Sequence, residues 1–316
     1  MNDKFGIDLS KLKHAEPTKF QVLPTVKGRV VHIDADFLAY QVSYDDEKTL
    51  AEMKSNCDTA VEKMRLMSGS EEVRLHLTPK GSNKGGRYDV ALLKEYQANR
   101  KDKPKPKFLH LMREWMHKER GAILHMNCEA DDGMSIAQYA AIAAGTPHLS
   151  VIASADKDLW MVPGLQLNWD TGELTNIEDN FGYIMLHESE SKSKTKKIKG
   201  RGWKFFWAQM LTGDTADNIQ GIPKICDLQY CPTGKFKACG PVLAYEILAP
   251  ITDNKTAFRV VRDLYKEYGD KIGFVNYRTG EPVKYGHAFQ SEAQLLWMRR
   301  EESVHDALNW MKEHCL

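Results

Sequence analysis

The order of apolar and polar positions along the chain predicts strands that alternate with helices. The largely apolar run VVHI at residues 30–33 predicts a buried strand, and a helical spacing of apolar residues follows it over 47–67. An alanine-rich helix, apolar on nearly every face, is expected to begin near Glu129. Four more strands are expected over residues 73–78, 121–127, 148–158 and 165–169. This alternation is typical of an α/β fold with a mostly parallel central sheet flanked by helices.

The pattern changes character near residue 190, where we expect a domain boundary. Residues 1–28 are a polar lead-in, and residues 29–190 form the predicted α/β core. From about Trp203 onward the spacing is helical, so residues 191–316 are expected to form a helical C-terminal region. The lysine-rich stretch SESKSKTKKIKGRGWK at this boundary is expected to be an exposed linker or hairpin.

Acidic side chains gather where the predicted strands end. Asp34 and Asp36 end the first strand, a pair of acids follows the fourth, and a cluster opens the helix after the third. Another pair lies in the later segment LTGDTADNIQGI, where a spacing of three on a helical turn gives both side chains one direction. Ligands of open α/β sheets bind at the carboxyl ends of the strands, so we expect all these groups at one edge. The eight candidate carboxylates are those of Asp34, Glu129, Asp131, Asp132, Asp156, Asp158, Asp214 and Asp217.

Carboxylates brought this close together require a compensating cation. Each close pair repels by roughly 1–4 kcal/mol at about 4 Å, and a buried carboxylate resists ionisation. Oxygen ligands without His or Cys favour Mg²⁺, with Mn²⁺ as a substitute, over zinc. Two such ions would clamp the oxygens of an in-line phosphoryl displacement. Each acidic motif alone has a simpler interpretation as a turn or a helix cap, but the four together favour a two-ion site.

Basic residues are concentrated in two segments, although the whole chain is nearly neutral, with 44 Lys and Arg against 43 Asp and Glu. The first segment, residues 87–107, contains YQANRKDKPKPK. We expect it to contact a polyanionic substrate, because lysine and arginine supply most of the affinity for phosphates. The second segment, residues 191–204, has basic and no acidic residues. A solvated loop and a substrate contact are equally good interpretations of it.

Composition disfavours secreted, membrane-spanning and zinc-binding proteins. The N-terminal stretch has no apolar run like a signal peptide, and no segment is long and apolar enough for a membrane span. The six cysteines are too sparse for a disulfide framework and lack a zinc-binding spacing. We therefore expect a cytoplasmic, monomeric protein with reduced thiols.

In their order and spacing, these motifs resemble those of the 5′-nucleases, or flap endonucleases, and most closely those of stand-alone bacteriophage 5′ exonucleases. The resemblance covers about residues 30–250 and rests on IDADFLAY, YQANRK, EADD, SADKD, GDTADNIQGI and GPVLAYEIL. It implies two-metal, Mg²⁺-dependent hydrolysis of DNA, or of RNA in an RNA–DNA hybrid, at or near a 5′ end or flap. It also implies a role in phage DNA replication or primer removal, with replication proteins as partners.

The resemblance assigns roles to individual residues. The ion ligands that it implies are Asp34, Glu129, Asp131 and Asp132 for one ion, and Asp156, Asp158, Asp214 and Asp217 for the other. Arg100 would contact the scissile phosphate, and residues 87–120 would form the family's arch over a single-stranded 5′ end. GDTADNIQGI and GPVLAYEIL together resemble a helix–hairpin–helix motif, whose backbone amides grip duplex phosphates. The residues expected to contact nucleic acid are Arg87, Arg100, Lys101, Lys103, Lys105, Gly221 and Gly240.

The chain departs from the family pattern at three points. Thr78 follows the second strand where the family usually has an Asp, so one metal ligand is missing. Gln97 replaces the Lys of the family's Tyr-Lys-x-x-Arg motif, and Lys94 or Lys101, about one helical turn away, is expected to supply its catalytic charge. Residues 223–239 interrupt the compact turn of the hairpin motif, which leaves open whether that turn binds a potassium ion.

Two other functions remain open at this stage. A non-catalytic protein that binds branched or flapped DNA would account for Gln97 and the missing Asp, but it would retain a costly acidic cluster. A ribonuclease of the related PIN type would share the sheet. Such domains are shorter and end after the sheet, whereas this chain continues with a basic segment and a helical region.

Overall fold

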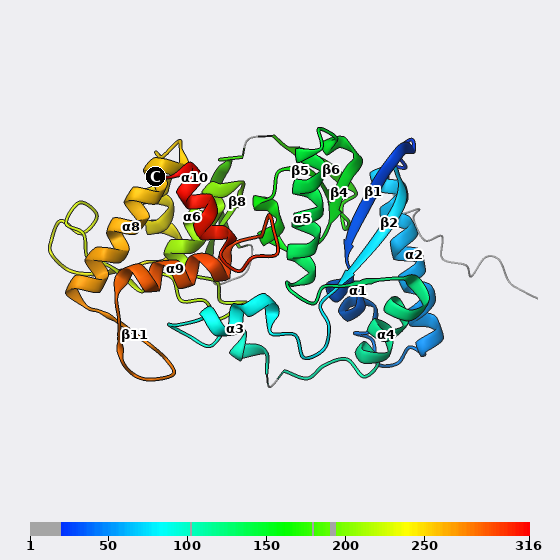
Figure 1. Ribbon diagram of the computed structural model, residues 1–316, viewed down its shortest axis with the longest axis horizontal. Coiled ribbons are helices and arrows are strands. Elements are labelled where there is room, and N and C mark those ends of the chain that lie inside the picture. The colour runs from blue at the N-terminus through cyan, green and yellow to red at the C-terminus, as the bar shows by residue number, and fades with distance from the viewer. Residues whose placement is uncertain (1–19, 102, 179, 190–193) are drawn as a thin grey trace, which may run out of the picture.

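The computed structural model describes residues 20–101, 103–178, 180–189 and 194–316. Its centre is a six-stranded sheet in the order β3-β2-β1-β4-β5-β6 (Figure 1). Strands β3 to β5 in this order are parallel, and β6 pairs antiparallel with β5. The strands are β1 (Val26–Asp34), β2 (Ser70–Leu77), β3 (Ile123–Leu124), β4 (Ser150–Ala153), β5 (Gly164–Asn168) and β6 (Glu173–Ile177). The predicted fold class, a mostly parallel sheet flanked by helices, is confirmed.

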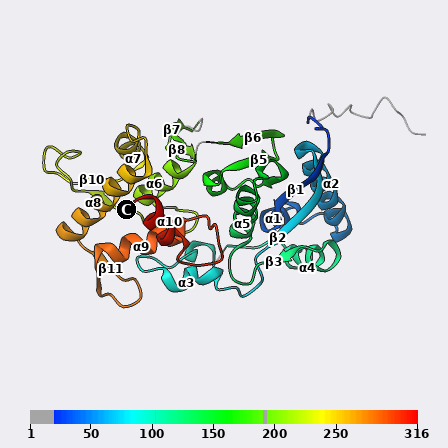
Figure 2. The same cartoon turned by 45° about the horizontal axis from the view of Figure 1, so that its top comes forward.

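Helices cover both faces of this sheet (Figures 1 and 2). They are α1 (Ala35–Val42), α2 (Leu50–Ser68), α4 (Leu109–Arg120) and α5 (Ala130–Ala143), with the short α3 (Arg87–Val90) beyond the sheet. Side chains of a strand alternate between its faces. Val31 and Ile33 therefore pack with residues of α1, α2 and α4, whereas Ile152 packs with Met134 of α5 on the other face.

The first helix was absent from the sequence prediction, which carried the first strand as far as Asp36. The strand ends at Asp34, whose carboxylate accepts a hydrogen bond from the Phe37 amide and caps α1 directly. Helix α2 agrees better with its prediction, because local signals fix both of its ends. Thr49 and Glu52 form a capping box at its start, and Gly69, at φ 61°, ends it in the left-handed conformation.

Helix α5 lies unusually close to the sheet at its first turn. A Cβ atom added at Gly133 would lie 2.1 Å from the His125 ring, so only glycine fits there. His125 is the last of three imidazoles linked by hydrogen bonds across the sheet, from His32 to His76 at 2.9 Å and from His76 to His125 at 2.8 Å. Burial lowers the pKa of all three rings, to about 4 for His32 and about 2 for His76, so this chain of rings is neutral at physiological pH. The close approach fixes where the acids at the start of α5 lie.

The C-terminal part is mainly helical and packs beside the sheet along the long axis of the molecule (Figure 1). Its helices are α6 (Trp203–Thr212), α7 (Pro241–Leu248), α8 (Asn254–Lys271), α9 (Tyr285–Leu296) and α10 (Asp306–His314). The strand pairs are β7 (Tyr183–Glu188) with β8 (Lys196–Arg201), β9 (Lys224–Ile225) with β10 (Lys237–Ala238), and β11 (Phe274–Val275) with β12 (Pro282–Val283).

The lysine-rich stretch predicted as a linker or hairpin enters β8 of an antiparallel hairpin. The domain boundary expected near residue 190 lies outside the described residues, as does most of the lead-in over residues 1–28. Within the described part of the chain, no helix has both the length and the apolar character that a membrane span requires.

A cluster of tryptophans forms the centre of the C-terminal core. Trp310 of α10 is fully buried, with its ring centroid 4.6 Å from that of Trp297 and 4.8 Å from that of Trp203. Trp207 lies 6.0 Å from the same ring. One aromatic side chain of α10 therefore packs against both α6 and the end of α9.

Replacing Trp310 with Ala should destabilise the protein by about 3–5 kcal/mol, because it removes a buried indole and leaves a cavity. Equilibrium unfolding in urea, followed by tryptophan fluorescence and circular dichroism, measures this loss. Leu316→Ala is the matched control, since Leu316 is 71% exposed, and it should change the free energy of unfolding by no more than about 0.5 kcal/mol. Equal effects of the two substitutions would contradict this account of the core.

Candidate active site

An acidic cavity of 530 Å³ opens at the carboxyl edge of the sheet. Its carboxylates come from the junction of β1 and α1, the start of α5, the loop after β4 and the loop after α6. The acids that line it are Asp34, Asp36, Glu129, Asp131, Asp156 and Asp217. Most of the predicted carboxylates therefore share one cavity, as the carboxyl ends of parallel strands require.

Thr78 directly follows β2, at the position where the family pattern has an aspartate. Its hydroxyl oxygen accepts a hydrogen bond from the Ala130 amide at 3.0 Å, which ties β2 to the start of α5. The Thr78 amide donates to Asp36 Oδ2 at 3.1 Å, and Arg113 pairs with the other oxygen of that carboxylate at 2.6 Å. A threonine and the neighbouring Asp36 thus fill this side of the cavity.

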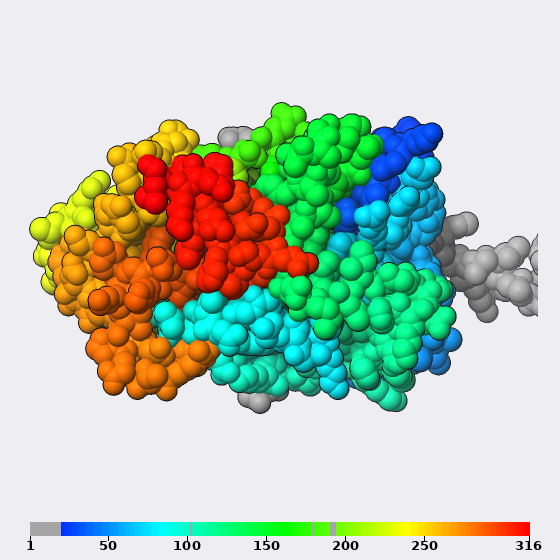
Figure 3. Space-filling model, viewed as in Figure 1, coloured from blue at the N-terminus to red at the C-terminus, as the bar shows by residue number. Residues whose placement is uncertain are grey.

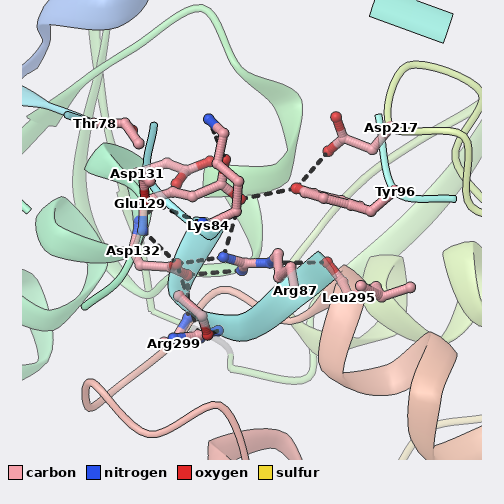
Figure 4. A network of polar contacts seen from close by, with 12 residues as sticks. Thr78, Lys84, Arg87, Tyr96, Glu129, Asp131, Asp132, Asp217, Leu295 and Arg299 are labelled. Carbon is pink, nitrogen blue, oxygen red and sulfur yellow. Dashed lines mark hydrogen bonds and ion pairs between the residues drawn. The ribbon is translucent and has the colours of Figure 1, made fainter. Parts of the chain in front are cut away.

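Glu129 is held at the N-cap of α5 by three groups from the segment before α4 (Figure 4). Lys84 Nζ lies 3.0 Å from Oε1, Arg87 Nη1 lies 3.1 Å from Oε2, and the Tyr96 hydroxyl donates to Oε2 at 2.8 Å. The helix N-terminus further favours negative charge at this position. Lys84 also lines the cavity, where it adds positive charge next to the acids.

Lys84 was not among the predicted site residues, although the sequence carries a signal for it. In NKGGR, Lys84 precedes Arg87 by three residues, which is the Lys-x-x-Arg spacing that was assigned to Gln97 and Arg100. Lys84 has φ 57°, in the left-handed region, and glycines surround it. Of the three lysines, Lys84 lines the cavity, whereas Lys94 and Lys101 lie outside its lining.

Asp132 is fully buried and forms a bidentate ion pair with Arg87 (Figure 4). Arg87 Nη1 lies 2.5 Å from Oδ2 and Nη2 lies 2.9 Å from Oδ1. The same guanidinium donates to the carbonyl oxygens of Leu295 and Trp297, and the Arg299 amide donates to Asp132. Burial opposes ionisation of Asp132, but Arg87 outweighs it and holds the pKa below its ordinary value.

This ion pair overturns two expectations from the sequence. Arg87 is 1% exposed, so the prediction that it contacts nucleic acid is wrong. Asp132 lies outside the cavity lining and binds Arg87 through both oxygens, so it supports the site from behind instead of facing an ion. The two residues had to be buried together because neither charge is stable alone in the interior.

Asp217 forms the opposite wall of the cavity together with the segment around Gln97. Gln97 Nε2 donates to Asp217 Oδ1 at 3.0 Å, and Arg100 pairs with the same oxygen. The Tyr96 hydroxyl, whose hydrogen points to Glu129 at the shorter distance, lies 3.3 Å from Asp217 Oδ2. Burial raises the pKa of Asp217, and Arg100 partly offsets this rise. Arg100 is half exposed and lines the cavity, so its guanidinium can reach a bound anion.

Asp158 and Asp214 share the ammonium group of Lys157 and lie outside the acidic cavity's lining. Lys157 Nζ lies 2.7 Å from Asp158 Oδ1 and 2.7 Å from Asp214 Oδ2. Gln209 Nε2 donates to Asp158 Oδ1 at 2.6 Å. Burial raises the pKa of Asp158 to about 8. Burial also opposes ionisation of Asp214, but Lys157 outweighs it and holds that pKa below its ordinary value.

The remaining predicted contacts lie at different distances from the cavity. Lys94 and Lys101 are exposed outside its lining, and Lys101 pairs with Glu95. Gly221 is buried, and its amide donates to Glu292 Oε2 at 2.7 Å, so the prediction that this amide grips a phosphate is wrong. Lys103 and Lys105 are exposed, and Gly240 lines a second cavity of 670 Å³ next to the first.

Asp34, Asp131 and Asp156 differ from the other acids, because none of them forms an ion pair within the described part of the chain. Burial raises the pKa of Asp34 to about 7, and the charges of Asp36 and Asp156 add to the rise. Burial, with the charges of Glu129 and Asp132, raises the pKa of Asp131 well above its ordinary value. These shifts are what uncompensated carboxylates around a cation site would show.

The donor set of these three side chains fits a hard divalent cation. Oxygen ligands without His or Cys suit Mg²⁺ or Mn²⁺. Glu129 supplies a fourth carboxylate, which also forms an ion pair with Lys84. Among the described residues, however, no three ligating side chains converge on one point as they stand. The ligand types therefore suit the ion, and the side chains would have to rotate to bring their oxygens together around it.

Comparison with solved structures finds proteins of similar fold. A structure of the bacteriophage T5 D15 protein co-crystallised with metal ions matches at a TM-score of 0.46 and 12% identity, covering 84% of this chain and 88% of that chain. The T5 D15 flap endonuclease in a pseudo-enzyme–product complex with DNA and metal ions matches at 0.47 and 14%, covering 90% of each chain. The catalytic core of Rad2 with a DNA substrate matches at 0.35 and 13%, covering 80% and 70%.

No family model and no curated protein matches this chain. Because both the identities and the TM-scores are low, we base the functional proposal on the site itself.

The raised pKa of Asp34 has a consequence for stability that can be measured without metal. Between its ordinary pKa of 3.8 and its folded pKa of about 7, the folded state binds more protons than the unfolded state, so stability falls as pH rises through this range. Asp34→Asn removes this fall and should stabilise the metal-free protein by roughly 2–4 kcal/mol at pH 8, with little gain near pH 4.

Urea unfolding in EDTA at pH 4, 6 and 8 checks this prediction. Asp170→Asn, a substitution in the exposed turn between β5 and β6, serves as the control and should leave the stability difference independent of pH. A stability gain for Asp34→Asn that stayed constant from pH 4 to 8 would contradict the proposed electrostatic cause.

Proposed function

We propose that this protein is a divalent-metal-dependent nuclease that hydrolyses phosphodiester bonds of DNA at or near 5′ ends or flaps. The observation that carries the proposal is the acidic cavity, which Asp34, Asp131 and Asp156 line together without forming an ion pair to any described residue. Such repulsion is costly unless a cation relieves it. Mg²⁺ is the expected ion, and Mn²⁺ is expected to substitute for it.

The chain's own residues would bind and orient the phosphate. Arg100 is half exposed at the cavity wall, held by Asp217 and by the Ala216 carbonyl oxygen. Its fixed guanidinium is suited to a phosphate oxygen, because arginine can donate two parallel hydrogen bonds. Lys84 lines the same cavity and can reach the same anion if it leaves Glu129. A bound divalent ion would supply charge that stabilises the phosphoryl group during displacement.

Two exposed aromatic side chains of α1 mark the mouth of the cavity. Phe37 is 43% exposed and Tyr40 is 41% exposed, and both line the cavity. Exposed aromatic rings beside a phosphate site are suited to stacking with nucleobases, which favours a substrate with unpaired bases near the cut. This arrangement supports a frayed or single-stranded 5′ end as the substrate.

The predicted arch, residues 87–120, runs from α3 to α4 on one side of the cavity. Figure 3 shows the part around α3 between the C-terminal helices and α4. Lys103, Lys105 and Lys107 are exposed along it, and we propose that they guide the 5′ strand as an arch. The C-terminal region, with α6 and α7 joined by residues 213–240, would hold the duplex at a distance from the cut.

A 5′-labelled flap duplex tests the function directly. The wild-type chain should release short 5′ products in Mg²⁺ or Mn²⁺ and none in EDTA. Asp156→Asn, which removes a carboxylate from the cavity, should lower the rate at least ~100-fold, since removing even supporting groups of a metal site costs 10–100-fold. Asp263→Asn, on the exposed face of α8, should leave the rate unchanged.

The same assay distinguishes the alternatives. Tight flap binding without cleavage in either metal would identify a structure-specific DNA-binding protein and refute the nuclease. Faster cleavage of single-stranded RNA than of the DNA flap would favour the PIN-type ribonuclease. An RNA–DNA hybrid with a 5′ RNA end tests a role in primer removal, where cleavage at the junction is the expected result.

The basic arch predicts a specific salt dependence. The triple substitution of Lys103, Lys105 and Lys107 by Ala should lower the slope of log affinity against log salt by about 2 for a single-stranded 5′ end, because each phosphate contact contributes about 0.7. Fluorescence anisotropy in Ca²⁺ over a range of KCl concentrations measures the slope. A matched triple of Arg259, Lys266 and Lys312 to Ala, exposed on α8 and α10, should leave it unchanged.

A further inference from the structure

Lys157 lies between two of the predicted ion ligands in sequence and between two of them in space. It follows Asp156 and precedes Asp158, directly after β4. Its Nζ lies 2.7 Å from Asp158 Oδ1 and 2.7 Å from Asp214 Oδ2. Asp214 comes from the loop after α6, so the ammonium joins the sheet to the C-terminal region.

Both of these carboxylates are buried, at 9% exposure for Asp158 and 6% for Asp214. Their other contacts are also made within the chain, since Gln209 donates to Asp158 and the Ala216 amide donates to Asp214 Oδ1. Two buried acidic groups at this distance from one positive charge form a cation-binding site. Here the ion is a side chain of the protein.

The acids of the first group are arranged differently. Asp34, Asp131 and Asp156 line the open cavity and form no ion pair with the described part of the chain. The acidic residues therefore divide into a group that lacks a cation and a group that already has one. Lys157 lies at the border, because it lines both the acidic cavity and the second cavity of 670 Å³.

We propose that the Lys157 ammonium occupies the cation position between Asp158 and Asp214, so that the protein binds one divalent ion, at Asp34, Asp131 and Asp156, where its acidic motifs imply two. The inference rests on the proposed function for the first ion. It also assigns Lys157 the task of neutralising the second group of acids before any metal or substrate arrives.

Charge and geometry support this division. A divalent ion placed between Asp158 and Asp214 would have to displace an ammonium that already makes two charge-assisted contacts. The Lys157 side chain is 50% exposed, so the displaced ammonium would turn into the two cavities that it lines. Mutual repulsion between that ammonium and a second ion would oppose binding.

Counting bound Mn²⁺ on the full-length protein tests the proposal without an activity assay. Isothermal titration calorimetry, with electron paramagnetic resonance of free Mn²⁺, should give one ion for the wild type. Lys157→Met should give two, because Asp158 and Asp214 lose their cation. Lys157→Arg keeps a positive charge in place and should bind one.

Asp214→Asn and Asp156→Asn form a second test that does not require Lys157 to be removed, and it applies even if Lys157→Met does not fold. Asp214→Asn should keep the Mn²⁺ affinity within about twofold of the wild type, since Asp214 binds no metal. Asp156→Asn should lower the affinity at least ~10-fold.

The outcomes separate this proposal from the proposed function. Two ions on the wild type, or one ion on a folded Lys157→Met variant, would overturn the role of Lys157 and leave the nuclease standing. A large loss of affinity in Asp214→Asn would overturn it as well. If the wild type binds no Mn²⁺ at all, the metal-dependent nuclease itself fails, and this inference fails with it.

Discussion

The structure around the cavity depends on repulsion between carboxylates that the fold brings to one edge of the sheet. Parallel strands place acids from separate motifs side by side, and burial makes each charge costly. Basic side chains of the protein neutralise part of this charge. Arg87 binds Asp132, Lys157 joins Asp158 to Asp214, and Arg100 binds Asp217. What remains is a smaller uncompensated group that faces the opening.

The acids with an ion-pair partner and the acids without one have different roles, although they look alike in sequence. Those bound to arginine or lysine hold segments of the chain together across long distances, as Asp214 does between the loop after β4 and the end of α6. Those left without a partner are the ones able to attract a cation or an electrophilic centre. Carboxylates in the same motif, such as Asp131 and Asp132, can fall on opposite sides of this division.

Much of the fold followed from periodicity, whereas the pairing of charges did not. The central strands and the start of α5 were predicted because apolar runs and capping residues are local signals. The length of β3 was missed because the extent of a strand depends on its pairing with a neighbour, here β2. The helix α1 was missed although its cap, Asp34, is a local signal. The clustering of acids was predicted from topology.

Which basic side chain meets which acid could not be predicted. Arg87 looked like a surface residue of a basic segment, but a short helix with an N-terminal glycine turns it inward to Asp132. Lys84 was overlooked because the Tyr-x-x-x-Arg spacing around Gln97 competed with it for the same assignment. Charge pairing of this kind depends on side-chain directions that sequence spacing alone does not fix.

The network around Arg87 also has a consequence for how the protein is made. Its guanidinium is bound by the carbonyl oxygens of Leu295 and Trp297, and the Arg299 amide completes the shell of Asp132 (Figure 4). These partners lie at the end of α9 and just after it, far along the chain from both Arg87 and α5. While a ribosome still holds that stretch, the start of α5 lacks the contacts that position its acids. The growing chain therefore completes the support of its acidic cavity only after the segment that follows α9 has left the ribosome.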